Sequence, residues 1–71
     1  EYQRSLDDID KVLAIEPRHF GALAGRAQIF IELQEYQKAI KDLKRAKKIH
    51  PIITSNNLIT ELEKLVKGLS I

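Results

Sequence analysis

The fold of this chain is decided by a stretch that occurs twice, EYQRSLDDIDKVLAIEP at residues 1–17 and EYQKAIKDLKRAKKIHP at residues 35–51. The copies are 34 residues apart and share six identities over 17 positions, including Pro17 and Pro51 at their ends. Several other positions carry conservative pairs of apolar, small or basic residues. Self-similarity at one fixed period is the sequence signature of a repeat architecture. The chain therefore contains an internal repeat of period 34.

Both copies, and the segments after them, place apolar residues at steps of three and four, which is the period of an amphipathic helix. The apolar stripes are Tyr2, Leu6, Ile9, Val12 and Leu13; Leu23, Ala27, Phe30 and Leu33; Tyr36, Ala39, Ile40, Leu43, Ala46 and Ile49; and Leu58, Ile59, Leu62, Leu65, Val66 and Leu69. Each copy stops before a proline, which disfavours helix in the residue that precedes it. We predict helices over residues 2–15, 20–33, 36–49 and 54–69. The short turn at Gln34-Glu35 makes its neighbouring helices antiparallel.

The fourth segment carries signals at both ends. It opens with Thr54-Ser55-Asn56-Asn57, a cluster of residues that are favoured as helix N-caps. Gly68 follows Lys64 and Lys67, which suits a helix C-terminus in backbone freedom and in charge.

The composition excludes several classes of protein. With 71 residues, the chain is long enough for one small domain. The absence of Cys removes disulfides, thiolate zinc sites and cysteine nucleophiles. A net charge of +2 is too small to indicate a nucleic-acid or membrane partner. No apolar run approaches the roughly 18 residues of a membrane span.

The beginning of the sequence bears on the compartment. The chain has no Met and opens in the middle of the repeat, so we expect a fragment of a longer protein. The compartment is therefore unknown. The cytoplasm is the default, and the bacterial periplasm is the alternative if the missing N-terminal part carries a signal peptide.

The central unit resembles a tetratricopeptide repeat, whose pattern is W-x2-L-G-x2-Y, then A-x3-F, then P. The slots are filled in order by Leu23, Arg26, Ala27, Phe30, Ala39, Leu43 and Pro51. Ala27 and Ala39 are small where the paired helices of this family cross closely. Arg26 departs from the family's leucine, and we expect its aliphatic stem to lie along the core while its guanidinium reaches water.

The resemblance implies an all-α fold of antiparallel helix-turn-helix repeats, wound as a right-handed superhelix with four helices here. Residues 1–71 would form a single domain fragment of this kind. Within it, 1–17 resembles the second helix of a preceding repeat, 20–51 a complete repeat, and 54–69 a C-terminal capping helix of a bacterial-type array.

The resemblance also implies a function, that of a non-catalytic protein–protein interaction module or scaffold. In this family the first helix of each repeat lines a concave groove, which here would bind a partner peptide or helix between helices 20–33 and 54–69. The residues of helix 20–33 that point away from the core stripe are Gly21, Ala24, Gly25, Gln28, Ile31 and Glu32. For Ile31 the alternative is packing on the neighbouring helix. The Lys, Arg and Asn with which some members clamp a terminal carboxylate are not at these positions.

Catalysis, cofactors and metals are not expected. The sequence has no nucleophile–base set and no phosphate-binding glycine motif around Gly21 and Gly25. His19 and His50 are 31 residues apart without acidic or histidine partners at helical spacing, and zinc needs three or four ligands. We expect His50 to end its helix as a cation. The acidic residues Asp7, Asp8 and Asp10 are expected on a solvated helix face.

Two alternatives remain beside peptide binding. The first helix, 1–15, offers Tyr2, Leu6 and Ile9 as apolar surface that a second copy could cover, giving a homo-oligomer. Helix 36–49 carries six cations against Asp42 alone, which a nucleic acid could recognise. The alternative is that these cations pair with acidic residues of the neighbouring repeat. The 34-residue shift aligns Asp7 with Lys41 and Asp10 with Lys44, so stacked repeats would place these opposite charges side by side. Nucleic acid therefore ranks below a protein partner.

Overall fold

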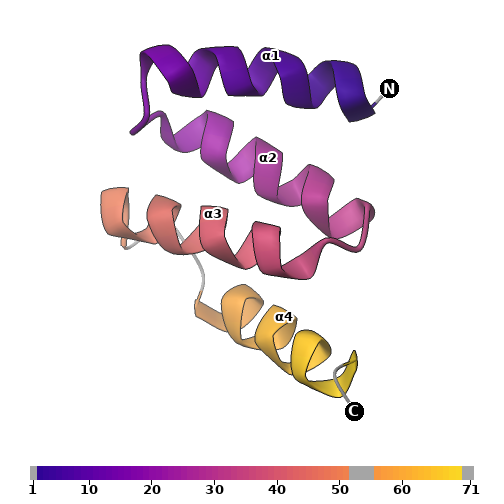
Figure 1. Ribbon diagram of the computed structural model, residues 1–71. Coiled ribbons are helices and arrows are strands. Elements are labelled where there is room, and N and C mark those ends of the chain that lie inside the picture. Colours follow the sequence, from indigo (N-terminus) through magenta and orange to yellow (C-terminus); the bar gives the residue numbers. More distant parts are fainter. Residues whose placement is uncertain (1, 52–55, 70–71) are drawn as a thin grey trace.

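The computed structural model describes residues 2–51 and 56–69, and over these residues the chain is all-α, as predicted (Figure 1). Its helices are α1 (Tyr2–Ile15), α2 (Phe20–Glu32), α3 (Tyr36–Ile49) and α4 (Asn56–Leu69). The predicted range for α2 is one residue too long. The predicted cap residues Thr54 and Ser55 lie outside the described residues. Gly68 lies in the last turn of α4, and no described glycine has a positive φ.

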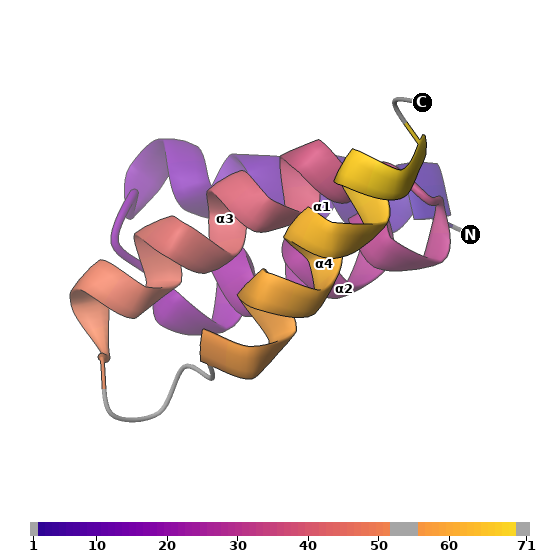
Figure 2. The same cartoon turned by 90° about the horizontal axis from the view of Figure 1, so that it is seen from below.

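The helices form a thin stack in which each one packs on the next in the sequence. Figure 1 shows the antiparallel order, with α2 between α1 and α3, and α4 beside α3. Seen from below in Figure 2, α4 is nearest and α1 farthest away. The Cα atoms extend over 38 × 30 × 14 Å. A stack this thin leaves two broad faces open, and α2 contributes side chains to both.

The turn between α2 and α3 is closed by backbone hydrogen bonds. The N–H of Glu35 donates to the C=O of Phe30 at 2.8 Å, and the N–H of Gln34 donates to the C=O of Ile31 at 3.0 Å. This pairing is a Schellman motif, whose reversing residue takes the left-handed conformation. Gln34 has φ 62°, in the region that glycine usually occupies. The motif lets α3 begin at Tyr36, directly beside α2.

His19 caps the start of α2. Its Nδ1 accepts a hydrogen bond from the N–H of Ala22 at 3.0 Å, which satisfies one of the unpaired donors of the first turn. A ring nitrogen that accepts carries no proton, so the neutral ring is protonated on Nε2. The cap holds the α1–α2 turn at the position where α2 begins to pack on α1.

The core consists of two clusters that share no buried residue. One joins α1, α2 and α3 through Leu13, Ala22, Leu23 and Ala46. The other joins α2, α3 and α4 through Ala27, Ala39, Leu43, Ile59 and Leu62. Ala27 and Ala39 are 1% and 0% exposed and belong to the cluster in which α2 packs on α3. The clusters place α2 and α3 at the centre of the stack.

Candidate functional site

The predicted binding residues lie on α2, and the structure places them at different depths. Three are exposed, namely Gly21, Gln28 and Glu32, and three are partly buried, namely Ala24, Gly25 and Ile31. At 100° per residue, the exposed three project from one side of the helix. We call this surface, with Ala24 at its edge, the Gln28 face.

The partly buried members have contacts inside the stack. Ile31 packs against the cluster that contains Ile59 and Leu62, as the alternative prediction of packing on a neighbouring helix expected. A Cβ built at Gly25 would lie 3.8 Å from Cδ1 of Ile9, so this position faces α1. The exposed part of the predicted site therefore comprises fewer than the six predicted residues.

The glycine at the start of the Gln28 face lies close to the cap. A Cβ built at Gly21 would lie 3.3 Å from Cε1 of His19, nearer than ordinary van der Waals contact. Without a side chain, Gly21 leaves room for the capping ring and keeps the backbone of the first turn open to solvent.

Tyr2 borders the same face from α1. Its pKa is raised above the ordinary value, first by a hydrogen bond to the carboxylate of Glu32 and then by the negative charge of that group. Sequence reasoning assigned Tyr2 to the apolar stripe of α1, but its side chain is 45% exposed. The far end of the Gln28 face thus carries a phenol and a carboxylate side by side.

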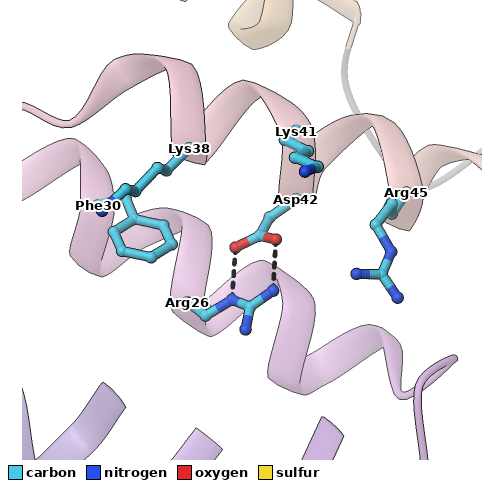
Figure 3. A pocket seen from close by; sticks show the side chains of 6 residues that line it. All are labelled: Arg26, Phe30, Lys38, Lys41, Asp42 and Arg45. Carbon is cyan, nitrogen blue, oxygen red and sulfur yellow. Dashed lines mark hydrogen bonds and ion pairs between the residues drawn. The ribbon is translucent and has the colours of Figure 1, made fainter. Parts of the chain in front are cut away.

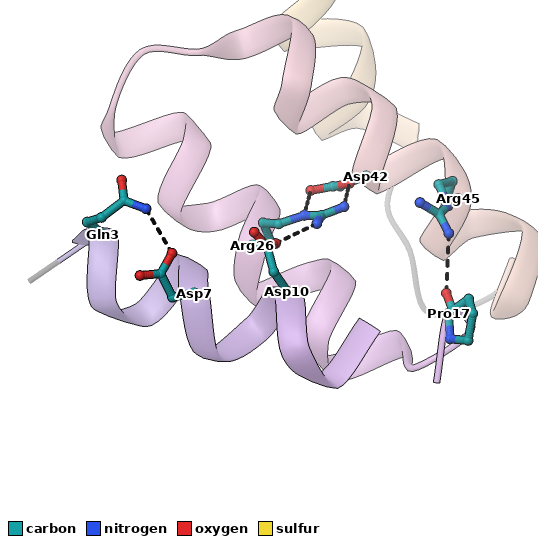
Figure 4. A network of polar contacts seen from close by, with 7 residues as sticks. All are labelled: Gln3, Asp7, Asp10, Pro17, Arg26, Asp42 and Arg45. Atoms are coloured by element: carbon teal, nitrogen blue, oxygen red, sulfur yellow. Dashed lines mark hydrogen bonds and ion pairs between the residues drawn. The ribbon is translucent and has the colours of Figure 1, made fainter. Parts of the chain in front are cut away.

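The opposite face of α2 is built around Arg26, two positions from Gln28 and therefore on the other side of the helix. Its Nε and Nη2 donate to Oδ2 and Oδ1 of Asp42 on α3 at 2.7 and 2.8 Å. Its Nη1 donates to Oδ1 of Asp10 on α1 at 2.9 Å (Figure 4). Hydrogen bonding to Asp42 raises the pKa of Arg26 above its ordinary value, against the opposing effect of burial.

This network overturns one expectation from the sequence. The guanidinium of Arg26 was expected to reach water, but it links three helices and its side chain is 19% exposed. Asp42 is 3% exposed, and burying a carboxylate is tolerated when a bidentate cation satisfies it. Arg26, which stands where the family pattern has leucine, therefore has Asp42 as its ion-pair partner.

The expected pairing of charges between the repeat copies is wrong. Asp10 pairs with Arg26 instead of Lys44, and Lys44 Nζ lies 3.2 Å from Oε2 of Glu63 on α4. Asp7 accepts a hydrogen bond from Gln3 on its own helix at 2.9 Å. The reason is geometric. Because α2 lies between α1 and α3, Asp10 of α1 pairs with Arg26 of α2 and not with Lys44 of α3.

The two histidines lie at helix ends, His19 as the N-cap of α2 and His50 directly after α3. His50 follows the last residue of α3, where its N–H donates to the C=O of Ala46 at 2.9 Å. Its ring meets Phe20 edge to face, with centroids 4.9 Å apart, a contact that sequence reasoning missed. Among residues 2–51 and 56–69, no three or more His, Cys, Asp or Glu side chains gather where they could hold a metal ion. In the same residues, no helix combines the length and apolar character that crossing a bilayer requires.

Comparison with known proteins shows a relative of this chain. Over 50 residues, 70% of this chain, the sequence is 46% identical to a TPR repeat-containing protein of Rhizobium etli. The match covers 24% of that protein, so the chain spans about a quarter of its length. No family model and no solved structure matches the chain.

Proposed function

Because this chain belongs to the tetratricopeptide repeat family, we propose that it is a non-catalytic module that binds a peptide or helix of another protein through the Gln28 face. Proteins of this family generally serve as protein–protein interaction scaffolds. The observation that carries the proposal is the exposure of Gly21, Gln28 and Glu32 on the first helix of the central repeat.

The chemistry of this face suits a peptide backbone. Gly21 has no side chain, and Ala24 has a short one, so a partner chain can approach the helix closely. Gln28 is exposed and offers both a donor and an acceptor, as a peptide group requires. Glu32 adds one carboxylate beside the Tyr2 phenol. None of these groups forms an activated nucleophile or an acid–base pair, which favours binding over catalysis.

Fewer residues are available for partner contact than the sequence predicted. Ile31 packs on the core cluster, so we assign it to stability rather than to partner contact. Gly25 faces Ile9 and is likewise a packing position. Partner contact then rests on Gly21, Ala24, Gln28 and Glu32, with α4 as the neighbouring element.

The test is to select peptides that bind the 71-residue chain from a displayed random library and to map them by backbone amide chemical shifts. We expect the largest shifts at Gly21, Gln28 and Glu32. Gln28→Lys should weaken the selected peptides about tenfold or more, because it adds bulk and charge at the contact. Gln37→Lys is the matched control, since Gln37 is an exposed glutamine on α3.

The peptide affinities of the two variants decide whether the Gln28 face is the binding site. Retained affinity in Gln28→Lys, or an equal loss in Gln37→Lys, would contradict the assignment of this face. Both variants should keep the helical circular dichroism of the parent chain, because both positions are exposed.

Self-association through α1 is the second candidate. Its exposed apolar side chains are Tyr2, Val12 and Ile15, at 45, 37 and 81%. Ile9, which the sequence analysis placed on this surface, packs instead on the core. Sedimentation equilibrium tests the idea, with Ile15→Lys expected to convert a dimer to a monomer. A parent chain that sediments as a monomer at high concentration would exclude it.

A further inference from the structure

A basic groove runs along α3 on the Arg26 side of the stack, away from the Gln28 face. It consists of two hollows that share Arg45. The first measures about 230 Å³ and is lined by Arg26, Phe30, Lys38, Lys41, Asp42 and Arg45 (Figure 3). The second measures about 240 Å³ and is lined by Pro17, Arg18, Arg45, Lys48 and Ile49. We call the two together the Arg45 groove.

The cations on α3 form one row along this groove. Lys38, Lys41, Arg45 and Lys48 are spaced by three, four and three residues, which puts them on one side of the helix. The row is about 15 Å long at 1.5 Å per residue. Figure 3 shows Lys38, Lys41 and Arg45 extending from α3, with Phe30 and Arg26 coming from α2.

Most of this positive charge has no carboxylate to neutralise it. The groove lining contains six cations and one carboxylate, a net charge of +5, whereas the whole chain carries +2. Arg26 and Lys38 have ion-pair partners in Asp42 and Glu35. Within the residues that the structure describes, no carboxylate oxygen lies within 4.0 Å of the charged nitrogens of Arg18, Lys41, Arg45 or Lys48.

Asp42, the acidic residue in the groove lining, is already paired with Arg26. Both oxygens of Asp42 accept from Arg26, and the residue is 3% exposed, so it does not turn outward to meet Lys41 or Arg45. Arg45 donates a long hydrogen bond of 3.4 Å from its Nη2 to the C=O of Pro17. The fold therefore buries its own acid and leaves the neighbouring cations in solvent.

We propose that the Arg45 groove binds an acidic peptide segment of a partner protein, at a site separate from the Gln28 face. A single extended chain matches the row of cations, because about five residues at 3.3 Å each span about 15 Å. Carboxylates along that chain would face the row. Pro17 and Ile49 line the second hollow and provide apolar contact for peptide side chains that lie between the carboxylates.

The groove fits a peptide better than a nucleic acid. Phe30 is the aromatic residue in its lining, and Arg26 and Lys38 already lie 6.0 and 5.6 Å from its ring centroid. That occupied ring offers no open platform for stacking a base. Asp10 on α1, which is 59% exposed, pairs with Arg26 beside the groove and would repel a second line of phosphates. One row of charge favours one acidic chain.

The test is fluorescence anisotropy with the whole 71-residue chain and a dye-labelled decapeptide of alternating Glu and Ala. A Gln-Ala decapeptide and a ten-nucleotide single-stranded DNA are the comparison probes. The double variant Lys41→Glu/Arg45→Glu should weaken the Glu-Ala peptide about tenfold or more at low salt. Its matched control is Lys11→Glu/Lys64→Glu, which makes the same change in net charge at exposed positions on α1 and α4.

Binding that is weakened in the groove variant, retained in the control and absent for the Gln-Ala peptide supports the proposal. An equal loss in both double variants would overturn the site. Tighter binding of the DNA than of the Glu-Ala peptide would overturn the class of partner. Amide shifts in the unmodified chain give a second readout that needs no variant. Shifts at residues 38–48 support the groove, and shifts confined to Gly21, Ala24, Gln28 and Glu32 overturn it.

Discussion

Arg26 and Asp42 are joined by two parallel hydrogen bonds of 2.7 and 2.8 Å at the junction of α2 and α3. Their side chains are 19 and 4% exposed, so the pair lies mostly out of water. Such a pair contributes little net stability over two apolar side chains, but each partner depends on the other. The same guanidinium also holds Asp10 of α1 at 2.9 Å. One side chain therefore sets the positions of three helices relative to one another.

The first prediction concerns this pair. Arg26→Leu restores the residue of the family pattern but leaves the buried Asp42 without its cation, and we expect it to lower the free energy of unfolding by about 3 kcal/mol. The double variant Arg26→Leu/Asp42→Leu should recover most of that loss. Urea denaturation followed by circular dichroism measures both. A single variant as stable as the parent chain, or a double variant no better than the single one, would refute the account.

The second prediction concerns the left-handed residue in the α2–α3 turn. Gln34 has φ 62°, which is strained for a residue with a Cβ. Gln34→Gly should raise the free energy of unfolding by about 1 kcal/mol, equivalent to about 4–8 °C in Tm for a domain of this size. Gln34→Ala, which keeps the Cβ, is the control and should leave Tm near that of the parent chain. Equal Tm values for the two variants would show that φ is not the cause.

The third prediction compares two glycines of α2. Gly25→Ala places a Cβ 3.8 Å from Ile9 Cδ1, an ordinary contact, so it should stabilise the helix by about 1 kcal/mol. Gly21→Ala places its Cβ 3.3 Å from the ring of His19, which must move and weaken the cap. Its gain should therefore be smaller or reversed. Thermal denaturation of both variants decides the matter, and identical shifts would contradict the role of the cap.

The fourth prediction concerns Tyr2 and pH. The hydrogen bond to Glu32 raises the pKa of the Tyr2 phenol, so Glu32→Gln should bring that pKa down. A raised folded-state pKa means that the contact favours folding at pH below about 10, the ordinary phenol value, and is lost as the pH rises through the folded-state pKa. NMR titration of the Tyr2 ring measures the shift. Glu61→Gln, an exposed change on α4, should leave the Tyr2 titration unaltered.

The helices could be predicted because their information is local and repeated. The shift of 34 residues aligns Pro17 with Pro51, and apolar steps of three and four cover every segment between turns. The small residues Ala27 and Ala39 were predicted at the crossing from the family pattern, and both are buried. These features need no knowledge of how the helices meet.

The polar contacts could not be predicted in the same way. The Arg26–Asp42 pair spans 16 residues and depends on how α2 crosses α3. The sequence did contain a signal for this pair, because Arg26 and Asp42 each interrupt the apolar stripe of their helix and carry opposite charges. Asp8, the counterpart of Asp42 in the first copy, is exposed, so comparison of the two copies did not indicate that Asp42 is buried. The αL conformation of Gln34 and the cap at His19 were missed because neither residue is the usual one at such a position.

The thin stack also determines how the molecule opens. Among the described helices, the backbones of α2 and α3 each lie beside two others, whereas those of α1 and α4 each lie beside one. Releasing an outer helix therefore breaks one interface, and releasing an inner one breaks two. Nearest-neighbour coupling of this kind makes stability a sum along one dimension. Amide hydrogen exchange should accordingly be slowest in α2 and α3 and progressively faster outward, so that the Arg26–Asp42 junction is the last part of the structure to open.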